Sequence, residues 1–226
     1  MTTSLKPVLH FLAQLAENNN KPWFEAHRAD YDEARGCFED FVEGVISSFR
    51  RSDKLGDLAA KDCMGRPNRD IRFSRDKSPY KTSMGAAIAP AGRKSARLGY
   101  HIYLRPGGET VVAGGLYMPD SQQLQRFRQA VAQDATPFRK IINAKAAKEQ
   151  FGGVHGERLK TAPQGFSREH PAIDLLQLKQ ITLVRHYSDA EVLAEDFLPS
   201  ALQACKAMRP FLSWLEETAG PGTDSL

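Results

Sequence analysis

The strongest constraint on the fold of this 226-residue chain is a helical stripe of side chains between Trp23 and Phe49. The stripe recurs every three or four residues, as one face of an α-helix does, through positions 23, 24, 27, 31, 34, 38, 41, 42, 45, 46 and 49. A shorter stripe predicts a helix over 5–17, and Asn18–Asn20 with Pro22 predict a turn between the two helices. Two amphipathic helices need another layer that buries their apolar faces.

Strand-like patterns supply that layer in the middle and late parts of the chain. Ile71 and Phe73 alternate with polar neighbours, as do the side chains of 100–104, and this is typical of half-buried strands. The runs "MGAAIAP", "TVVAGGLYM" and "QITLVRHY" predict further strands, and "RPGGET" predicts a hairpin connection.

The C-terminal half adds predicted helices. One begins near Asp120–Ser121, one begins at "TPF" (136–138), and a capping box at Ser188 opens a helical region that we expect to be interrupted near Pro199 and Pro210. The prediction is an α+β fold with a mainly antiparallel sheet covered by long helices. We expect a single domain over 1–226, with an ordered core over about 5–217 and a short flexible tail.

The sequence also bears on compartment. No run approaches the roughly 18 to 20 apolar residues of a membrane span, and the first residues resemble a helix more than a signal peptide. Cys37, Cys63 and Cys205 are odd in number and far apart, which favours free thiols. We therefore expect a cytoplasmic protein with no membrane partner.

Charge is concentrated in one segment. Residues 61–105 contain eleven Lys or Arg and three Asp, a local net charge of +8 in a chain whose total is +4. The rest of the chain is therefore mildly acidic, and the basic segment predicts an anionic partner.

The candidate site lies in the stretch "DIRFSRDKSPYKTSMG", residues 70–85. If Ile71 and Phe73 face the core, Arg72 turns to the opposite face, and Pro79 ends the strand in an exit loop. Cationic side chains and loop amides hold phosphate or carboxylate oxygens well. We predict ligand binding by Arg72, Arg75, Lys77, Tyr80, Lys81 and Tyr117, and tentative catalytic roles for Asp76, Lys77 and His170. The alternative is a solvated face whose charges pair with acids elsewhere.

Familiar catalytic motifs do not fit. "SRDK" matches the S-x-x-K pattern, but it lacks the helical turn that this chemistry needs. The six histidines show no metal-ligand spacing, so we predict no metal and no cofactor. His170 could transfer a proton or could simply fix its loop through a hydrogen bond.

Four segments carry a resemblance: "NNNKPWFEAHRADY", "FSRDKSPYKT", "GLYMPD" and "HPAIDLLQLK". They resemble signature segments of a widespread uncharacterised family known as domain of unknown function 2461. The resemblance spans nearly the whole chain and implies a stand-alone domain, but it implies no activity, substrate or cofactor. The recurring positions it carries over are Asn19, Trp23, Phe24, Arg28, Tyr31, Ser74, Asp76, Lys77, Tyr80, Lys81, Thr82, Tyr117, Pro119, His170, Pro171, Asp174 and Lys179.

Three functional hypotheses follow. The first is a site for a small anionic ligand or nucleotide, with hydrolysis or transfer at a phosphate or phosphodiester as the reaction. The second is a nucleic-acid-binding module in which the basic 66–105 region follows the backbone and Tyr80 or Tyr103 stacks on a base. The third is a protein-interaction domain that docks an acidic partner.

Overall fold

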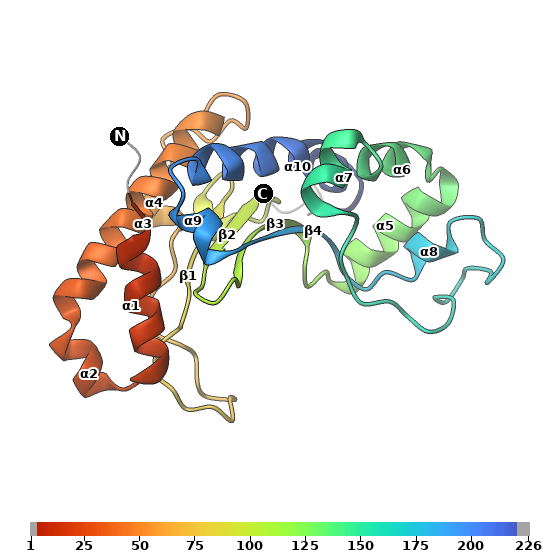
Figure 1. Cartoon of the computed structure of the whole chain (residues 1–226). Coiled ribbons are helices and arrows are strands. Elements are labelled where there is room, and N and C mark those ends of the chain that lie inside the picture. The colour runs from red at the N-terminus through yellow and green to blue at the C-terminus, as the bar shows by residue number, and fades with distance from the viewer. Residues whose placement is uncertain (1–3, 221–226) are drawn as a thin grey trace. The chain divides into compact units, whose positions relative to one another are not determined.

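The structure, a computed structural model, describes residues 4–220 and has an α+β fold (Figure 1). A four-stranded antiparallel sheet, in the order β1-β2-β3-β4, packs against helices. The strands are β1 (Met84–Ile88), β2 (Tyr100–Leu104), β3 (Thr110–Leu116) and β4 (Ile181–Tyr187). The helices are α1 (Lys6–Glu17), α2 (Lys21–Ala26), α3 (Arg28–Phe49), α4 (Ala60–Cys63), α5 (Ser121–Gln133), α6 (Thr136–Ile142), α7 (Lys145–Phe151), α8 (Ile173–Leu176), α9 (Asp189–Leu193), α10 (Phe197–Ala219) and the short 3₁₀ helix η1 (Gly92–Lys94).

The chain forms two compact units. Of the described residues, the first unit comprises 4–95, Tyr100–Val112 and His186–Leu202, and the second comprises Ala96–Gly99, Ala113–Arg185 and 203–220. The predicted α+β class, with an antiparallel sheet covered by helices, is confirmed. The prediction of a single domain stays a prediction.

In the first unit, α1 and α3 lie side by side (Figure 1) and bury the predicted stripes against each other. The expected long helix from Trp23 is divided in two at His27, which separates α2 from α3. The His27 ring stacks on Trp23 at 4.1 Å, and its Nδ1 lies 2.8 Å from the Trp23 carbonyl oxygen. The break lies in the backbone of His27, whose φ of −110° and ψ of 29° are not helical, and periodicity alone does not reveal it.

The first two strands form a regular antiparallel ladder in the first unit. Gly85 lies opposite Tyr103, and Ala87 lies opposite His101. Ile102 and Leu104 are fully buried, whereas Tyr103 is exposed on the other face. Burial of side chains of this size stabilises the fold by about 1.5–3 kcal/mol each. The face of β2 that carries Ile102 and Leu104 is therefore held in the core, and the face that carries Tyr103 is the one that can reach a ligand.

The second unit has an aromatic core. Phe127 on α5 and Phe138 on α6 pack against Phe211 and Trp214 of α10, with ring centroids 4.7 to 6.0 Å apart. The α5 helix begins at Ser121, where its sequence predicts a helix start, and the structure adds a capping box made by Asp120 and Gln123.

The expected strand at Ile71 and Phe73 is wrong. Residues 71–79 have no regular secondary structure, and Phe73 is 96% exposed instead of buried. Two apolar residues are too short a pattern to specify a strand against the competing side-chain hydrogen bonds of this loop. Consequently Arg72 is not placed by strand alternation.

The helical region after Ser188 is interrupted at 194–196, between α9 and α10, which is close to the break expected near Pro199. The interruption expected near Pro210 is wrong, because α10 runs through that proline. Pro199 lies in the first turn, where a missing N–H is tolerated. The ordered core is predicted to end near 217, but α10 continues to Ala219. The rest of the predicted tail, 221–226, lies outside the described residues.

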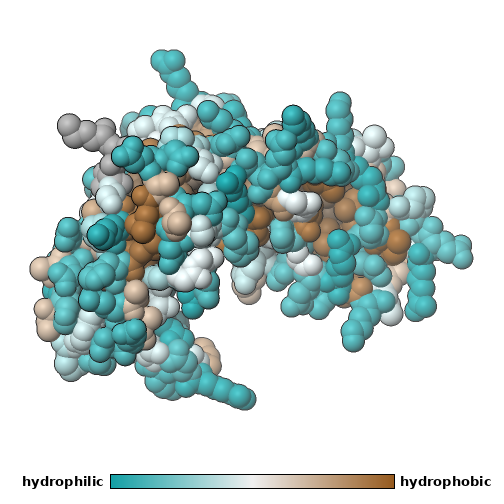
Figure 2. All heavy atoms as spheres, viewed as in Figure 1, coloured by the Kyte–Doolittle hydropathy of each residue, from teal (hydrophilic) through white to brown (hydrophobic). Residues whose placement is uncertain are grey.

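The surface seen in Figure 2 is mostly hydrophilic, including the loop that projects between α4 and β1 (Figures 1 and 2). Within residues 4–220, no helix combines the length and the apolar character that a bilayer crossing requires.

Candidate anion-binding cavity

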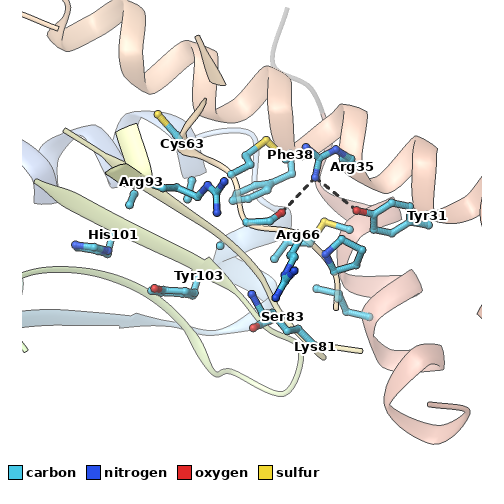
Figure 3. A pocket seen from close by; sticks show the side chains of 18 of the residues that line it. Tyr31, Arg35, Phe38, Cys63, Arg66, Lys81, Ser83, Arg93, His101 and Tyr103 are labelled. Carbon is cyan, nitrogen blue, oxygen red and sulfur yellow. Dashed lines mark hydrogen bonds between the residues drawn. The ribbon is translucent and has the colours of Figure 1, made fainter. Parts of the chain in front are cut away.

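A cavity of about 280 Å³ opens in the first unit between α1, α3, the segment after α4 and the β1–β2 ladder (Figure 3). Phe11, Leu12 and Leu15 of α1 contribute apolar side chains, together with Phe38 of α3 and Met64. The volume is close to the lower end of small-molecule pockets, roughly 300–1,000 Å³. The walls combine this apolar surface with polar and cationic groups.

The cations of the cavity come from separate parts of the fold (Figure 3). Arg35 lies on α3, Arg66 follows α4, Lys81 precedes β1, and Arg93 lies on η1. The Arg35 Nη1 group is 3.4 Å from the Gly65 carbonyl oxygen and 3.5 Å from the Tyr31 hydroxyl. These are long hydrogen bonds, and they restrain Arg35 only weakly.

Arg93 is positioned by an unusual backbone turn. Ala91 and Gly92 have positive φ values of 72° and 59°, a conformation that favours glycine. A β carbon on Gly92 would lie 2.5 Å from the carbonyl oxygen of Asp62. Gly92 therefore lets η1 pack closely against α4 and directs the chain so that Arg93 reaches the cavity.

The cations of the cavity have no carboxylate partner among the described residues that line it, since none of these residues is Asp or Glu. Within residues 4–220, Arg66, Lys81 and Arg93 form no salt bridge, whereas Arg69, Arg72 and other arginines do. Burial lowers the pKa of Lys81, and the charges of Arg66 and Arg93 lower it further. The cations therefore repel one another, and an anion would relieve that repulsion.

Strand β2 presents His101 and Tyr103 to the same cavity. Their rings are nearly parallel, with centroids 6.4 Å apart. Burial lowers the pKa of His101, so its imidazole is neutral at pH 7. The pair offers an aromatic surface and, in His101, a nitrogen able to accept a proton.

Cys63 also lines the cavity but is unsuited to nucleophilic chemistry. Burial, with the charges of Asp62 and Glu43, raises the pKa of its thiol to about 11. The thiolate is the reactive species, and it is scarce at neutral pH when the pKa is this high.

Of the predicted site residues, Lys81 lines the cavity, while Arg72, Arg75, Asp76 and Lys77 lie on the projecting loop. The Arg72 guanidinium donates two hydrogen bonds to Asp70, at 3.0 and 2.6 Å. The Lys77 ammonium donates to the Ile71 carbonyl oxygen at 3.0 Å. The structure brings these residues together within the loop and does not place them around the cavity.

Asp76 is engaged in holding the loop. The hydroxyl and backbone N–H of Ser78, followed by the Arg69 guanidinium, hold the pKa of Asp76 well below its usual range. A carboxylate of such low basicity is a weak proton acceptor at neutral pH. Its contacts favour a structural role over the tentative catalytic one.

Tyr80 joins two of the segments that carry the family resemblance. Asn19 accepts a hydrogen bond from the Tyr80 backbone N–H at 3.0 Å and donates to its carbonyl oxygen at 2.9 Å. The Tyr80 ring is buried and stacks on Phe24 at 4.0 Å. Tyr80 therefore anchors the end of the loop and does not present its ring to a ligand.

Tyr117 and His170 belong to the second unit. Tyr117 is 69% exposed just after β3. The Nδ1 of His170 accepts a hydrogen bond from the Ala172 backbone N–H at 3.1 Å, which matches the alternative that this histidine fixes its loop.

Sequence reasoning does not identify Arg35, Arg93 and His101 as members of one site. Arg66 and Arg93 belong to the basic segment and Tyr103 is a candidate for stacking, but nothing in their spacing indicates a shared cavity. Within the described residues, no group of three or more His, Cys, Asp or Glu side chains is arranged to hold a metal ion.

Comparison with known families assigns the chain to one of them. A family model described as "Conserved hypothetical protein (DUF2461)" matches residues 7–214, and the chain belongs to this family. The resemblance inferred from the four sequence segments is therefore confirmed. The comparison with curated proteins returned no match, and the comparison with solved structures returned none either.

Proposed function

We propose that the first unit binds a small ligand carrying a phosphate or carboxylate group in the cationic cavity. The observation that supports this most directly is the convergence of Arg66, Lys81 and Arg93 on one concave surface without a carboxylate partner among the described residues. Charge-assisted hydrogen bonds from such groups are the strong ones in anion recognition.

The other side chains that line the cavity indicate which chemical groups the ligand has besides its anionic group. The aromatic rings of His101 and Tyr103 and the apolar side chains of α1 suit a flat or apolar body. A nucleoside monophosphate combines such a body with a phosphate, so we propose small nucleotides as the first ligand class to test. The site differs from the predicted one in its position, since it shares only Lys81 with the predicted ligand-binding set.

Hydrolysis or transfer at a phosphate stays a prediction for this site. Among the titratable side chains that line the cavity, His101 offers a neutral imidazole whose ring nitrogen can accept a proton, although the burial that lowers its pKa also makes it a weaker base. Cations around a phosphate would stabilise charge that develops in the transition state.

Calorimetric titration with adenosine 5′-monophosphate, inorganic phosphate and citrate tests the binding proposal. Arg66→Ala or Arg93→Ala removes a charged hydrogen bond worth about 1.5–3 kcal/mol, so the affinity for the best probe should fall about 10- to 150-fold. Arg105→Ala is the matched control, because Arg105 is exposed and pairs with Glu109 at 2.8 Å in the β2–β3 hairpin. Equal effects of the three variants, or no binding of any probe, would contradict the proposal.

A further inference from the structure

The loop between α4 and β1 is held at its base by backbone hydrogen bonds, and its outer end, residues 70–77, does not line the cavity. At its base, the Arg69 backbone N–H donates to the Pro79 carbonyl oxygen at 2.9 Å, and that of Lys81 donates to the Pro67 carbonyl oxygen at 2.8 Å. Asn68 and Tyr80 form an antiparallel bridge between these bonds. The loop therefore begins and ends at a fixed two-stranded base.

The interior of the loop is organised by Arg69. Its guanidinium pairs with Asp76 and donates to the Ser78 carbonyl oxygen at 3.3 Å, to the Ser78 hydroxyl at 3.2 Å and to the Ser74 hydroxyl at 3.4 Å. The Ser78 backbone N–H donates to Asp76 at 2.9 Å. A loop held in this way loses less conformational entropy when a partner binds than a free chain does.

The outer end of the loop, residues 70–77, combines one exposed aromatic ring with cations. Phe73 is 96% exposed, and the Arg72 guanidinium carbon lies 5.9 Å from the centre of its ring. Arg75 and Lys77 are exposed on the same short segment. Asp70 and Asp76 are already paired inside the loop, with Arg72 and Arg69 respectively. The stretch 66–81 has six cations against two acids, so its outward charge is positive.

We propose that this loop end docks single-stranded nucleic acid, with the Phe73 ring stacked on a base and Arg75 and Lys77 close to the flanking phosphates. Aromatic rings between cationic groups are typical of single-strand binding, because every base offers a face for stacking and every nucleotide adds a phosphate. One ring is too little apolar surface for stable membrane insertion, which needs a larger buried apolar area. The proposal does not depend on the cavity, and it assigns stacking to Phe73 in place of the buried Tyr80.

Fluorescence anisotropy with a labelled oligothymidine of about 12 nucleotides is the test, using four substitutions at and away from the ring. Phe73→Ala should weaken binding about tenfold to a hundredfold, and Phe73→Trp should retain or strengthen it. Phe73→Leu keeps the apolar character and removes the ring, so it should bind as weakly as Phe73→Ala. Met118→Ala, which removes an 84% exposed apolar side chain from the second unit, should bind like the unchanged protein.

A charge reversal tests the interaction with phosphates. Arg75→Glu should weaken binding. It should also make the negative slope of log affinity against log salt concentration shallower, by about 0.7 for each phosphate that the protein no longer neutralises. Lys160→Glu makes the same charge change at an exposed residue of the second unit and should leave the slope unchanged.

Several results would overturn the proposal. These are an absence of oligothymidine binding, wild-type affinity for Phe73→Ala, or equal affinity for Phe73→Leu and the unchanged protein. Sedimentation with vesicles of phosphatidylcholine and phosphatidylserine that depends on Phe73, without oligothymidine binding, would instead assign the loop end to a lipid surface. Binding of an acidic peptide that depends on Phe73, without oligothymidine binding, would likewise assign the loop end to a protein partner.

Discussion

Gly85 lies directly opposite Tyr103 in the β1–β2 ladder, and the missing side chain of Gly85 makes room for the Tyr103 ring. A β carbon at Gly85 would come within 2.5 Å of two carbons of that ring. Because Tyr103 lines the cavity, one glycine determines how an aromatic wall of the candidate site is presented.

Gly85→Ala should therefore be destabilising through overpacking, by about 1–3 kcal/mol. The cost should largely disappear when Tyr103→Ala is present in the same chain, since the clashing ring is then gone. Urea unfolding of both single variants, the double variant and the unchanged protein measures this coupling. A cost that is the same with and without the Tyr103 ring would show that the two residues are independent.

The double hydrogen bond between Asn19 and the Tyr80 backbone should be important for the base of the loop. Asn19→Asp keeps the acceptor but replaces the donor with an oxygen that faces the Tyr80 carbonyl, so we expect a loss of about 1–3 kcal/mol in the free energy of unfolding. Amide exchange at Tyr80 and Lys81 should also become faster. Asn20→Ala, which removes the cap of α2 at a cost of about 1 kcal/mol, should leave the exchange of those two amides unchanged.

Arg69 should determine the order of the loop without contributing much to global stability. Arg69→Lys keeps the charge and removes the guanidinium that contacts Ser74, Asp76 and Ser78. Exposed ion pairs contribute about 0–1 kcal/mol, so the unfolding free energy should change little. Limited proteolysis within 70–78 should become several times faster, whereas Arg75→Lys should digest like the unchanged protein. If Arg69→Lys and Arg75→Lys are digested at the same rate, Arg69 does not order the loop.

His101 should make the folded state less stable in acid. Its pKa is lower in the folded chain than the roughly 6.5 of an unfolded chain, so the unfolded chain binds more protons as the pH falls through that range. The free energy of unfolding should decrease from pH 7 to pH 5, by at most about 1.4 kcal/mol per pH unit from this group.

His101→Asn should flatten that part of the pH profile, and denaturant unfolding at several pH values measures it. His186→Asn is the control, because His186 is exposed on β4. If the two variants have the same pH dependence, the acid sensitivity arises from other groups.

The elements with periodic or capping signals could be predicted from the sequence. The stripe of α3, the alternation of β2 and the capping boxes of α5 and α9 depend on neighbours within a few residues, so they are visible in local spacing. The break at His27 could not be predicted in the same way, because Trp23 and His27 both fit the helical stripe.

The candidate site was less predictable because it depends on residues far apart in the chain. Arg35, Arg66 and Arg93 meet only after α3, α4 and η1 have packed, and the positive φ values before Arg93 leave no plain trace in the sequence. The basic segment did indicate where positive charge gathers. It did not separate the cavity cations from those of the loop, since that division depends on which arginines find a carboxylate.

The paired backbone at the base of the loop also has a thermodynamic consequence. Arg66 and Pro67 enter the loop and Lys81 leaves it, and all three line the cavity. A ligand that changed the geometry of this short ladder on binding at one site would change the affinity at the other site, and linkage would make the two effects equal and reciprocal. The occupancy of the cavity and the occupancy of the loop end would then depend on each other through the backbone hydrogen bonds of the ladder.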